Sequence, residues 1–296
     1  MTIETIAHAD ERQVADAIRP RKRSARPMRW VVLAFLVLTL LISLVPVLLA
    51  LINAFKSPAD YAANGPAALP TSFSTDGIVT FWQSVDFGGK LWNSVLISSC
   101  VAVLGVALSV LTAYAIGIGR VRWSAALLAL FIVGLTLPQE MLVYPLYELS
   151  KQVGLYDTKL MVIIVFAVLQ SAFGTYFIAS VLTAFPMEVL EAARIDGAGK
   201  VRVLISVILP MLRPMLMVLA TFFFIWTWNE FFLPMVLLVS DANQTVTQAL
   251  GMLQGEMTSD PTTTAGASLL GILPTLIFFL IFQRTLTKGI TAGAVK

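Results

Sequence analysis

Residues 191–210 read EAARIDGAGKVRVLISVILP, a charged, glycine-containing island between hydrophobic segments that are each long enough to cross a bilayer. The island differs from the rest of the chain, which has 296 residues, 58% apolar content, only 12% charged residues and a mean hydropathy of +0.85. These values lie outside the range of ordinary soluble domains. The chain is therefore predicted to be a polytopic membrane protein whose island contacts something soluble.

The first half of the island predicts a short helix over residues 187–195. Pro186 suits the first turn of a helix, and Glu188 and Glu191 place negative charge near its positive N-terminal end. The residues expected to end this helix are Asp196, Gly197 and Gly199.

The second half predicts another helical run, with one apolar face formed by Val201, Leu204, Ile205 and Ile208. We expect this run to end or kink at Pro210 and Pro214. Because such short helices are marginal alone in water, the rest of the protein, the lipid surface or a partner must hold them. On composition alone, an amphipathic loop lying on the bilayer is as good an explanation as a docking element.

Six hydrophobic stretches match the length of about 20 apolar residues that a membrane helix needs. They are continuous and rich in Leu, Val, Ile, Phe and Ala rather than alternating, which favours helices over a membrane barrel. The predicted spans lie near residues 29–55, 91–118, 123–148, 159–183, 213–239 and 266–286.

The distribution of basic residues predicts the orientation. With six spans, both termini and the island share one side, and that side carries sixteen of the twenty Lys and Arg residues. The termini and the island are therefore predicted to be cytoplasmic. Topology alone explains the basic cluster before the first span, so we expect no nucleic-acid partner. The predicted organisation is a basic tail (1–28), an anchor helix (29–55), an extracytoplasmic loop (56–90), a five-helix core (91–286) containing the island loop (186–210), and a cytoplasmic tail (287–296).

The residues exclude most catalytic and metal sites. Cys100 and His8 are each the only residue of their kind, so no intrachain disulfide can form, no cysteine–histidine metal cluster is available, and most histidine-dependent catalytic sites cannot be built. There is no G-x-x-x-x-G-K-[ST] loop to cradle the phosphates of ATP. We expect neither an enzyme nor a chain that binds a metal or a cofactor itself.

The island resembles the E-A-A loop of binding-protein-dependent ABC transporter permeases. The matching residues are Glu191, Ala192, Ala193, Gly197, Leu209 and Pro210, with Val207 where the family usually has Ile. Further segments are similar to the maltose-type carbohydrate permease subunits: Asn93-Ser94, Ala113-Tyr114-Ala115, Pro145 to Thr158, Trp228 to Phe231, and Gln283 to Lys296. The first 50 or so residues carry no family signal.

This resemblance implies an all-α membrane protein of the type I ABC importer permease fold, with six transmembrane helices and a cytoplasmic coupling-helix loop between spans 4 and 5. It implies a bacterial inner-membrane subunit that pairs with a second permease, a heterodimer being favoured. Two ATP-binding subunits, which hold ATP and Mg, and an extracytoplasmic solute-binding protein would complete an importer for a sugar or oligosaccharide. Alternating access would be driven through the docking residues Glu191, Ala192, Ala193, Asp196 and Gly197.

A sugar pathway needs amide and hydroxyl partners together with aromatic faces. The candidate pathway residues are Gln170, Ser171, Trp228, Asn229 and Glu230, with Trp226 supplying a further ring. The alternative is that these residues form hydrogen bonds between helices and an interfacial aromatic belt.

Two other classes of function compete with the importer. A secondary transporter or channel independent of ATP would also be polytopic, but it predicts inverted repeats and helices broken near the midplane. A structural or assembly factor would leave the island unexplained.

Overall fold

The computed structural model describes residues 26–119, 121–183, 185–252 and 260–294. The chain divides into two units, Met1–Leu49 and Ala50–Lys296, and each is described by itself. The first unit contains most of helix α2 (Arg26–Ala54), an apolar helix with Pro46 inside it. The predicted tail, 1–28, lies outside the described residues apart from its last three, which begin this helix.

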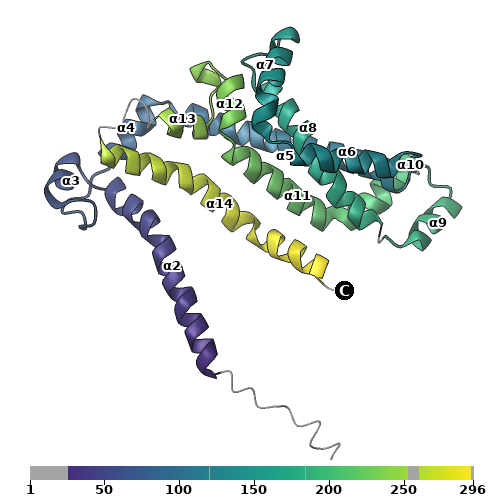
Figure 1. The fold of residues 1–296 in the computed structure, drawn as a ribbon, viewed down its shortest axis with the longest axis horizontal. Helices are drawn as coiled ribbons and strands as arrows, with labels where there is room; N and C mark the ends of the chain where they lie inside the picture. Colours follow the sequence, from purple (N-terminus) through teal and green to yellow (C-terminus); the bar gives the residue numbers. More distant parts are fainter. Residues whose placement is uncertain (1–25, 120, 184, 253–259, 295–296) are drawn as a thin grey trace, which may run out of the picture. The chain divides into compact units, whose positions relative to one another are not determined.

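Helices alone make up the regular structure of the described residues, so the all-α prediction is confirmed (Figure 1). Five helices are long and apolar enough to cross a membrane, and a bent pair raises the number to six if it forms one span. Beyond α2, the elements are α3 (Pro58–Asn64), α4 (Asp76–Ser84), α5 (Phe87–Gly117), α6 (Ser124–Thr136), η1 (Gln139–Leu142), α7 (Val143–Gln152), α8 (Lys159–Leu182), α9 (Met187–Ile195), α10 (Lys200–Val203), η2 (Leu204–Ile208), α11 (Leu209–Asn229), α12 (Phe232–Leu237), η3 (Asp241–Asn243), α13 (Val246–Met252) and α14 (Pro261–Ala294).

The predicted third span, 123–148, is not one straight helix. Helix α6 ends at Thr136, and the following helical segment, Gln139–Gln152, is bent by 97° relative to it. Leu137 is extended and precedes Pro138, which disfavours the helical conformation in the residue before it. Pro138 therefore breaks the helix within a segment that hydropathy alone predicted to be a single span.

Three other predicted boundaries also differ from the structure. The fifth span helix ends at Asn229 because Glu230 is extended, and α12 is a separate short helix. The predicted outer loop, 56–90, contains α3, α4 and the first turn of α5. Helix α14 continues to Ala294, so it includes most of the predicted tail, 287–296.

Helices α5, α8 and α11 pack together because small residues let their backbones approach closely. The ring of Phe223 on α11 is fully buried at Gly105 on α5 and Gly174 on α8. A Cβ atom at Gly105 would lie 2.8 Å from this ring, and one at Gly174 would lie 2.9 Å from it. The Ser109 hydroxyl donates to Gly105 O at 2.6 Å and to Ser171 O at 3.3 Å, so it bridges α5 and α8.

The N-terminal ends of α5 and α8 are connected by hydrogen bonds from the segment 237–246. Asp157, in the left-handed conformation before α8, accepts hydrogen bonds from the backbone N–H groups of Val239 and Ser240 at 2.9 and 3.0 Å and from the Ser240 hydroxyl. On α5, the buried Lys90 pairs with Asp241 at 2.7 Å. Asn93 donates to the carbonyls of Ala242 and Gln244, and Ser94 accepts from Val246 N–H. These contacts fix the segment 237–246 to two core helices.

The hydrogen bonds of Asp157 predict a sensitivity to acid. The Ser240 hydroxyl, followed by the backbone N–H groups of Ser240 and Val239, lowers the pKa of this carboxyl below its ordinary value of 3.8. A lowered folded-state pKa means that the carboxylate stabilises the fold at neutral pH and that this stabilisation is lost as the pH falls below 3.8. We expect Asp157→Asn to unfold at a lower temperature near pH 7 and to lose less stability than the wild type on acidification.

Tryptophan fluorescence during heating in detergent, from about pH 7 to about pH 3, measures this difference. The matched control is Asp86→Asn. Among the described non-glycine residues, only Asp86 and Asp157 have positive φ, so the two substitutions act on the same backbone conformation. Equal shifts for the two variants would contradict the assigned role of Asp157.

The glycine contacts around Phe223 predict that leucine is tolerated at one glycine and not at another. Gly174→Leu should destabilise the protein by about 1–3 kcal/mol or prevent folding, because the new side chain would overlap Ser109 and Phe223. A Cβ atom added at Gly134 on α6 would have no other atom within 4 Å, so Gly134→Leu is the control and should unfold near the wild-type temperature. Thermal unfolding of both variants in the same detergent tests this, and equal unfolding temperatures would refute it.

Candidate functional site

The island begins with helix α9, which has the predicted bounds, Met187–Ile195. Pro186 lies at the N-cap, Glu188 in the first turn and Arg194 in the last turn. This arrangement of charges suits the helix dipole at both ends.

Gly197 ends α9 through backbone geometry. Its φ angle is +76°, its N–H donates to Arg194 O at 3.0 Å, and the N–H of Ala198 donates to Ala193 O at 3.0 Å. These are the two hydrogen bonds of a Schellman motif, in which the left-handed position favours glycine. Gly197 therefore turns the chain between α9 and α10.

One face of α9 is anchored and the other is exposed. Leu190 is fully buried, and Ala193 is half-buried against the same cluster. Glu191, Ala192 and Ile195 are exposed, and Ile195 exposes 86% of its surface. The predicted docking residues Glu191, Ala192, Asp196 and Gly197 are thus exposed, whereas Ala193 lies at the edge of the anchored face.

The second half of the island differs from its prediction. Helix α10, the π-helical η2 and α11 form one helical run, Lys200–Asn229, so the prolines do not end it. Leu209 N–H donates to Leu204 O, a wide turn that accommodates Pro210, which has no N–H to donate. The predicted apolar face is only partly right, since Leu204 and Ile208 are buried with Val203, but Val201 and Ile205 are exposed.

The island shares its hydrophobic core with the membrane helices. Leu190, Val203 and Ile208 belong to the same buried cluster as residues of α5, α8 and α11, among them Ala113, Leu182, Leu212 and Phe223. The Tyr114 hydroxyl, near the end of α5, also donates to Lys200 O at 2.9 Å. Helix α9 therefore packs into the same buried cluster as three spans.

The structure does not bring the predicted pathway residues into one cavity. Gln170 is buried and donates to the Thr227 hydroxyl at 2.9 Å, and its Oε1 has no partner among the described residues. The Ser171 hydroxyl donates to Val168 O, and Glu230 follows α11, where its carbonyl accepts from the Thr247 hydroxyl. Asn229 is exposed and donates to Ile225 O.

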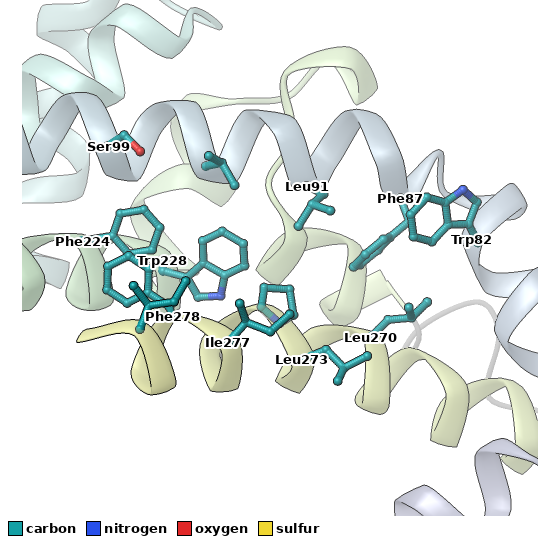
Figure 2. A pocket seen from close by; sticks show the side chains of 13 residues that line it. Trp82, Phe87, Leu91, Ser99, Phe224, Trp228, Leu270, Leu273, Ile277 and Phe278 are labelled. Carbon is teal, nitrogen blue, oxygen red and sulfur yellow. The ribbon is translucent and has the colours of Figure 1, made fainter. Parts of the chain in front are cut away.

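Trp228 lines an apolar cavity of about 530 Å³ between α4, α5, α11 and α14, shown in Figure 2. Its ring stacks on Phe224, which stacks in turn on Phe278 of α14. Trp226 instead contacts Phe173 of α8 edge-on, with ring centroids 5.0 Å apart. The two tryptophans, one residue apart on either side of Thr227, thus lie in different surroundings.

The residues 105–290 match the family model described as "Binding-protein-dependent transport system inner membrane component". The chain belongs to this family. It is 36% identical over 205 residues to a putative ABC transporter permease protein, ORF1, of Streptomyces antibioticus, covering 69% of this chain and 89% of the relative. It is 28% identical to the diacetylchitobiose uptake system permease protein NgcG of Streptomyces coelicolor, covering 89% of this chain and 87% of the relative.

A further relative is similar in sequence, and a solved structure has a similar fold. The chain is 25% identical to the melibiose/raffinose/stachyose import permease protein MelC of Bacillus subtilis, over 85% of this chain and 91% of the relative. Its fold matches a crystal structure of a bacterial ABC transporter involved in the import of the acidic polysaccharide alginate. The TM-score is 0.77 at 21% identity, covering 90% of this chain and 98% of the other.

The permease is accordingly a multi-pass inner-membrane component of a binding-protein-dependent importer, without ATPase activity of its own. The family thereby selects the importer over the secondary transporter and the assembly factor. Among the residues that the structure describes, no three His, Cys, Asp or Glu side chains are grouped to hold a metal ion.

Three contacts of the permease could not be predicted from the sequence. Leu190 looks like any apolar residue of an amphipathic helix, yet it anchors α9. Thr227 stands between two tryptophans without a pattern of its own, although it is the partner of Gln170. Tyr114 stands out in the sequence only as part of a family motif, and the structure gives its hydroxyl a partner in the island.

The backbone conformation of the island predicts unequal effects of alanine substitution at Gly197 and Gly199. A Cβ atom added at either one would have no other atom within 4 Å, but Gly197 has φ +76° and Gly199 has φ −69°. Gly197→Ala should therefore cost the end of α9 about 1–2 kcal/mol, while Gly199→Ala should leave the end of α9 nearly unchanged. Hydrogen exchange at the amides of residues 197 and 198 measures this cost, and equal protection in the two variants would contradict it.

Proposed function

We propose that this permease is the membrane subunit of an ATP-driven carbohydrate importer and that α9 docks on a separate ATPase subunit. The observation that carries the proposal is the burial of Leu190 in the same cluster as Leu182 and Phe223. Because interiors are close-packed, a push on α9 moves the packed helices together rather than deforming the contact. This supports rigid-body alternating access driven from the island.

The exposed face of α9 has the chemistry that docking requires. Glu191 offers a charge, Ala192 allows close approach, and the exposed Ile195 offers apolar area that a partner would bury. Asp196 and Gly197 follow at the end of the helix, so that the five predicted docking residues lie within two helical turns. A cleft on the ATPase subunit that accepts a short helix would contact all five docking residues. Ala193 would be contacted only on the side that does not pack against the core.

A carbohydrate substrate is supported by the relatives, whose names describe uptake of diacetylchitobiose and of melibiose, raffinose and stachyose. The partners in this proposal are a second permease, two ATPase subunits that hold ATP and Mg, and an extracytoplasmic solute-binding protein. The sixteen basic residues assigned to one side support a cytoplasmic position for the island and both termini.

The test is uptake by proteoliposomes that contain the permease with its partner permease, ATPase subunits and binding protein. We expect Glu191→Lys and Gly197→Asp to reduce ATP-driven uptake by at least about tenfold, because one reverses the docking charge and the other strains the turn. The variants should still insert into the membrane and unfold at nearly the wild-type temperature.

The matched control is Glu140→Lys, the same charge reversal at an exposed position in η1, outside the island. It should leave uptake near the wild-type rate. Normal uptake by Glu191→Lys at normal expression would refute docking through α9, and uptake without any ATPase subunit would refute the importer itself.

A further inference from the structure

Helix α14 has two different faces within the membrane. One face carries Leu270, Leu273, Pro274, Ile277 and Phe278 and lines the apolar cavity in Figure 2, opposite Trp228. The other face carries Ser268, Gly271, Ile272, Thr275 and Phe279. Both Ser268 and Thr275, the two hydroxyl-bearing residues of this helix between Ala265 and Phe282, therefore fall on the second face.

This second face lines a cavity of about 710 Å³ between α14, α11 and α13. Across it lie Ile225 and Asn229 of α11 and Leu250 of α13. Ser268 and Thr275 are seven residues apart, so their hydroxyls lie on one side of the helix about 10 Å apart along its axis. The cavity thus carries polar groups at two depths, with the ring of Phe279 beyond them.

These polar groups can still form hydrogen bonds with a solute. The Ser268 hydroxyl donates to Thr264 O at 2.8 Å, and the Asn229 amide donates to Ile225 O at 2.8 Å. These bonds use one hydrogen of each group, whereas a hydroxyl keeps acceptor lone pairs and a carboxamide keeps an acceptor oxygen and a second N–H. Polar side chains at membrane depth are costly on a lipid-facing surface and typically face a bundle interior or a watery path.

We propose that the cavity between α11 and α14, with Asn229, Ser268 and Thr275, is a section of the solute pathway and takes a hydroxyl-rich solute. The inference deepens the proposed carbohydrate import and rests on it. It assigns Ser268 and Thr275 to direct contact with the solute and keeps Asn229 as a pathway residue. Trp228, which was also predicted to line the pathway, instead packs on the apolar side of α14.

Cysteine accessibility in the assembled transporter tests the pathway without knowledge of the sugar. In a Cys100→Ala background, Ser268→Cys and Thr275→Cys should react with a negatively charged, membrane-impermeant methanethiosulfonate. Leu273→Cys and Ile277→Cys, on the opposite face, are the matched controls. We expect reaction at the first pair to be at least about tenfold faster, because a thiol in apolar surroundings forms less thiolate.

Uptake of raffinose and of diacetylchitobiose gives a second measurement. Thr275→Trp should obstruct the cavity and lower uptake of whichever sugar the wild type transports by at least about tenfold, with binding-protein-stimulated ATPase activity retained. The control is Ser99→Ala, which removes the hydroxyl that lines the apolar cavity and should leave uptake unchanged.

Equal labelling on the two faces, or labelling of Ser268→Cys and Thr275→Cys only when the permease is alone, would overturn the pathway assignment. Loss of subunit copurification in Thr275→Trp would assign this face to a subunit interface and would overturn it too. Either result leaves ATP-driven uptake by the wild type intact, so failure of this inference is distinguishable from failure of the proposed function.

Discussion

The packing of Phe223 against Gly105 and Gly174 is the contact on which the rest of the permease core depends. In a membrane the hydrophobic effect does little to hold helices together, so close packing and interhelical hydrogen bonds must do it. Two glycines and Ser109 bring α5 and α8 within reach of the Phe223 ring and of each other. A larger side chain at either glycine would separate helices that the other contacts need close.

The island is an extension of this core. Its buried residues continue the cluster that begins at Phe223, and Tyr114 adds a hydrogen bond from the end of α5 to the start of α10. The Schellman motif at Gly197 lets the chain leave α9 and re-enter the same core within a few residues. As a result α9 is short and exposed on one face, yet it is anchored in the same packed core as the spans.

The opposite end of the core is held by polar contacts. Hydrogen bonds and an ion pair fix the segment 237–246 to the beginnings of α8 and α5, through Asp157, Lys90, Asn93 and Ser94. Figure 1 shows this end, with α12 and α13, far from α9 and α10. Apolar packing near the island and the hydrogen bonds of the segment 237–246 thus hold α5 and α8 together at both of their ends.

The residue pattern by itself determined the all-helical membrane class, the bounds of α9 and the turn at Gly197, because these depend on local composition, helix capping and the φ angle that glycine permits. Only the tertiary structure decided which face of α10 is buried, where the third span breaks, and that Gln170 meets Thr227 rather than Trp228 or Asn229. Those features depend on which helix lies opposite each residue, and neighbours in space that are 57 residues apart in the chain leave no local pattern. For the same reason, the two faces of α14 could be distinguished only once α11 and α5 were in place beside them.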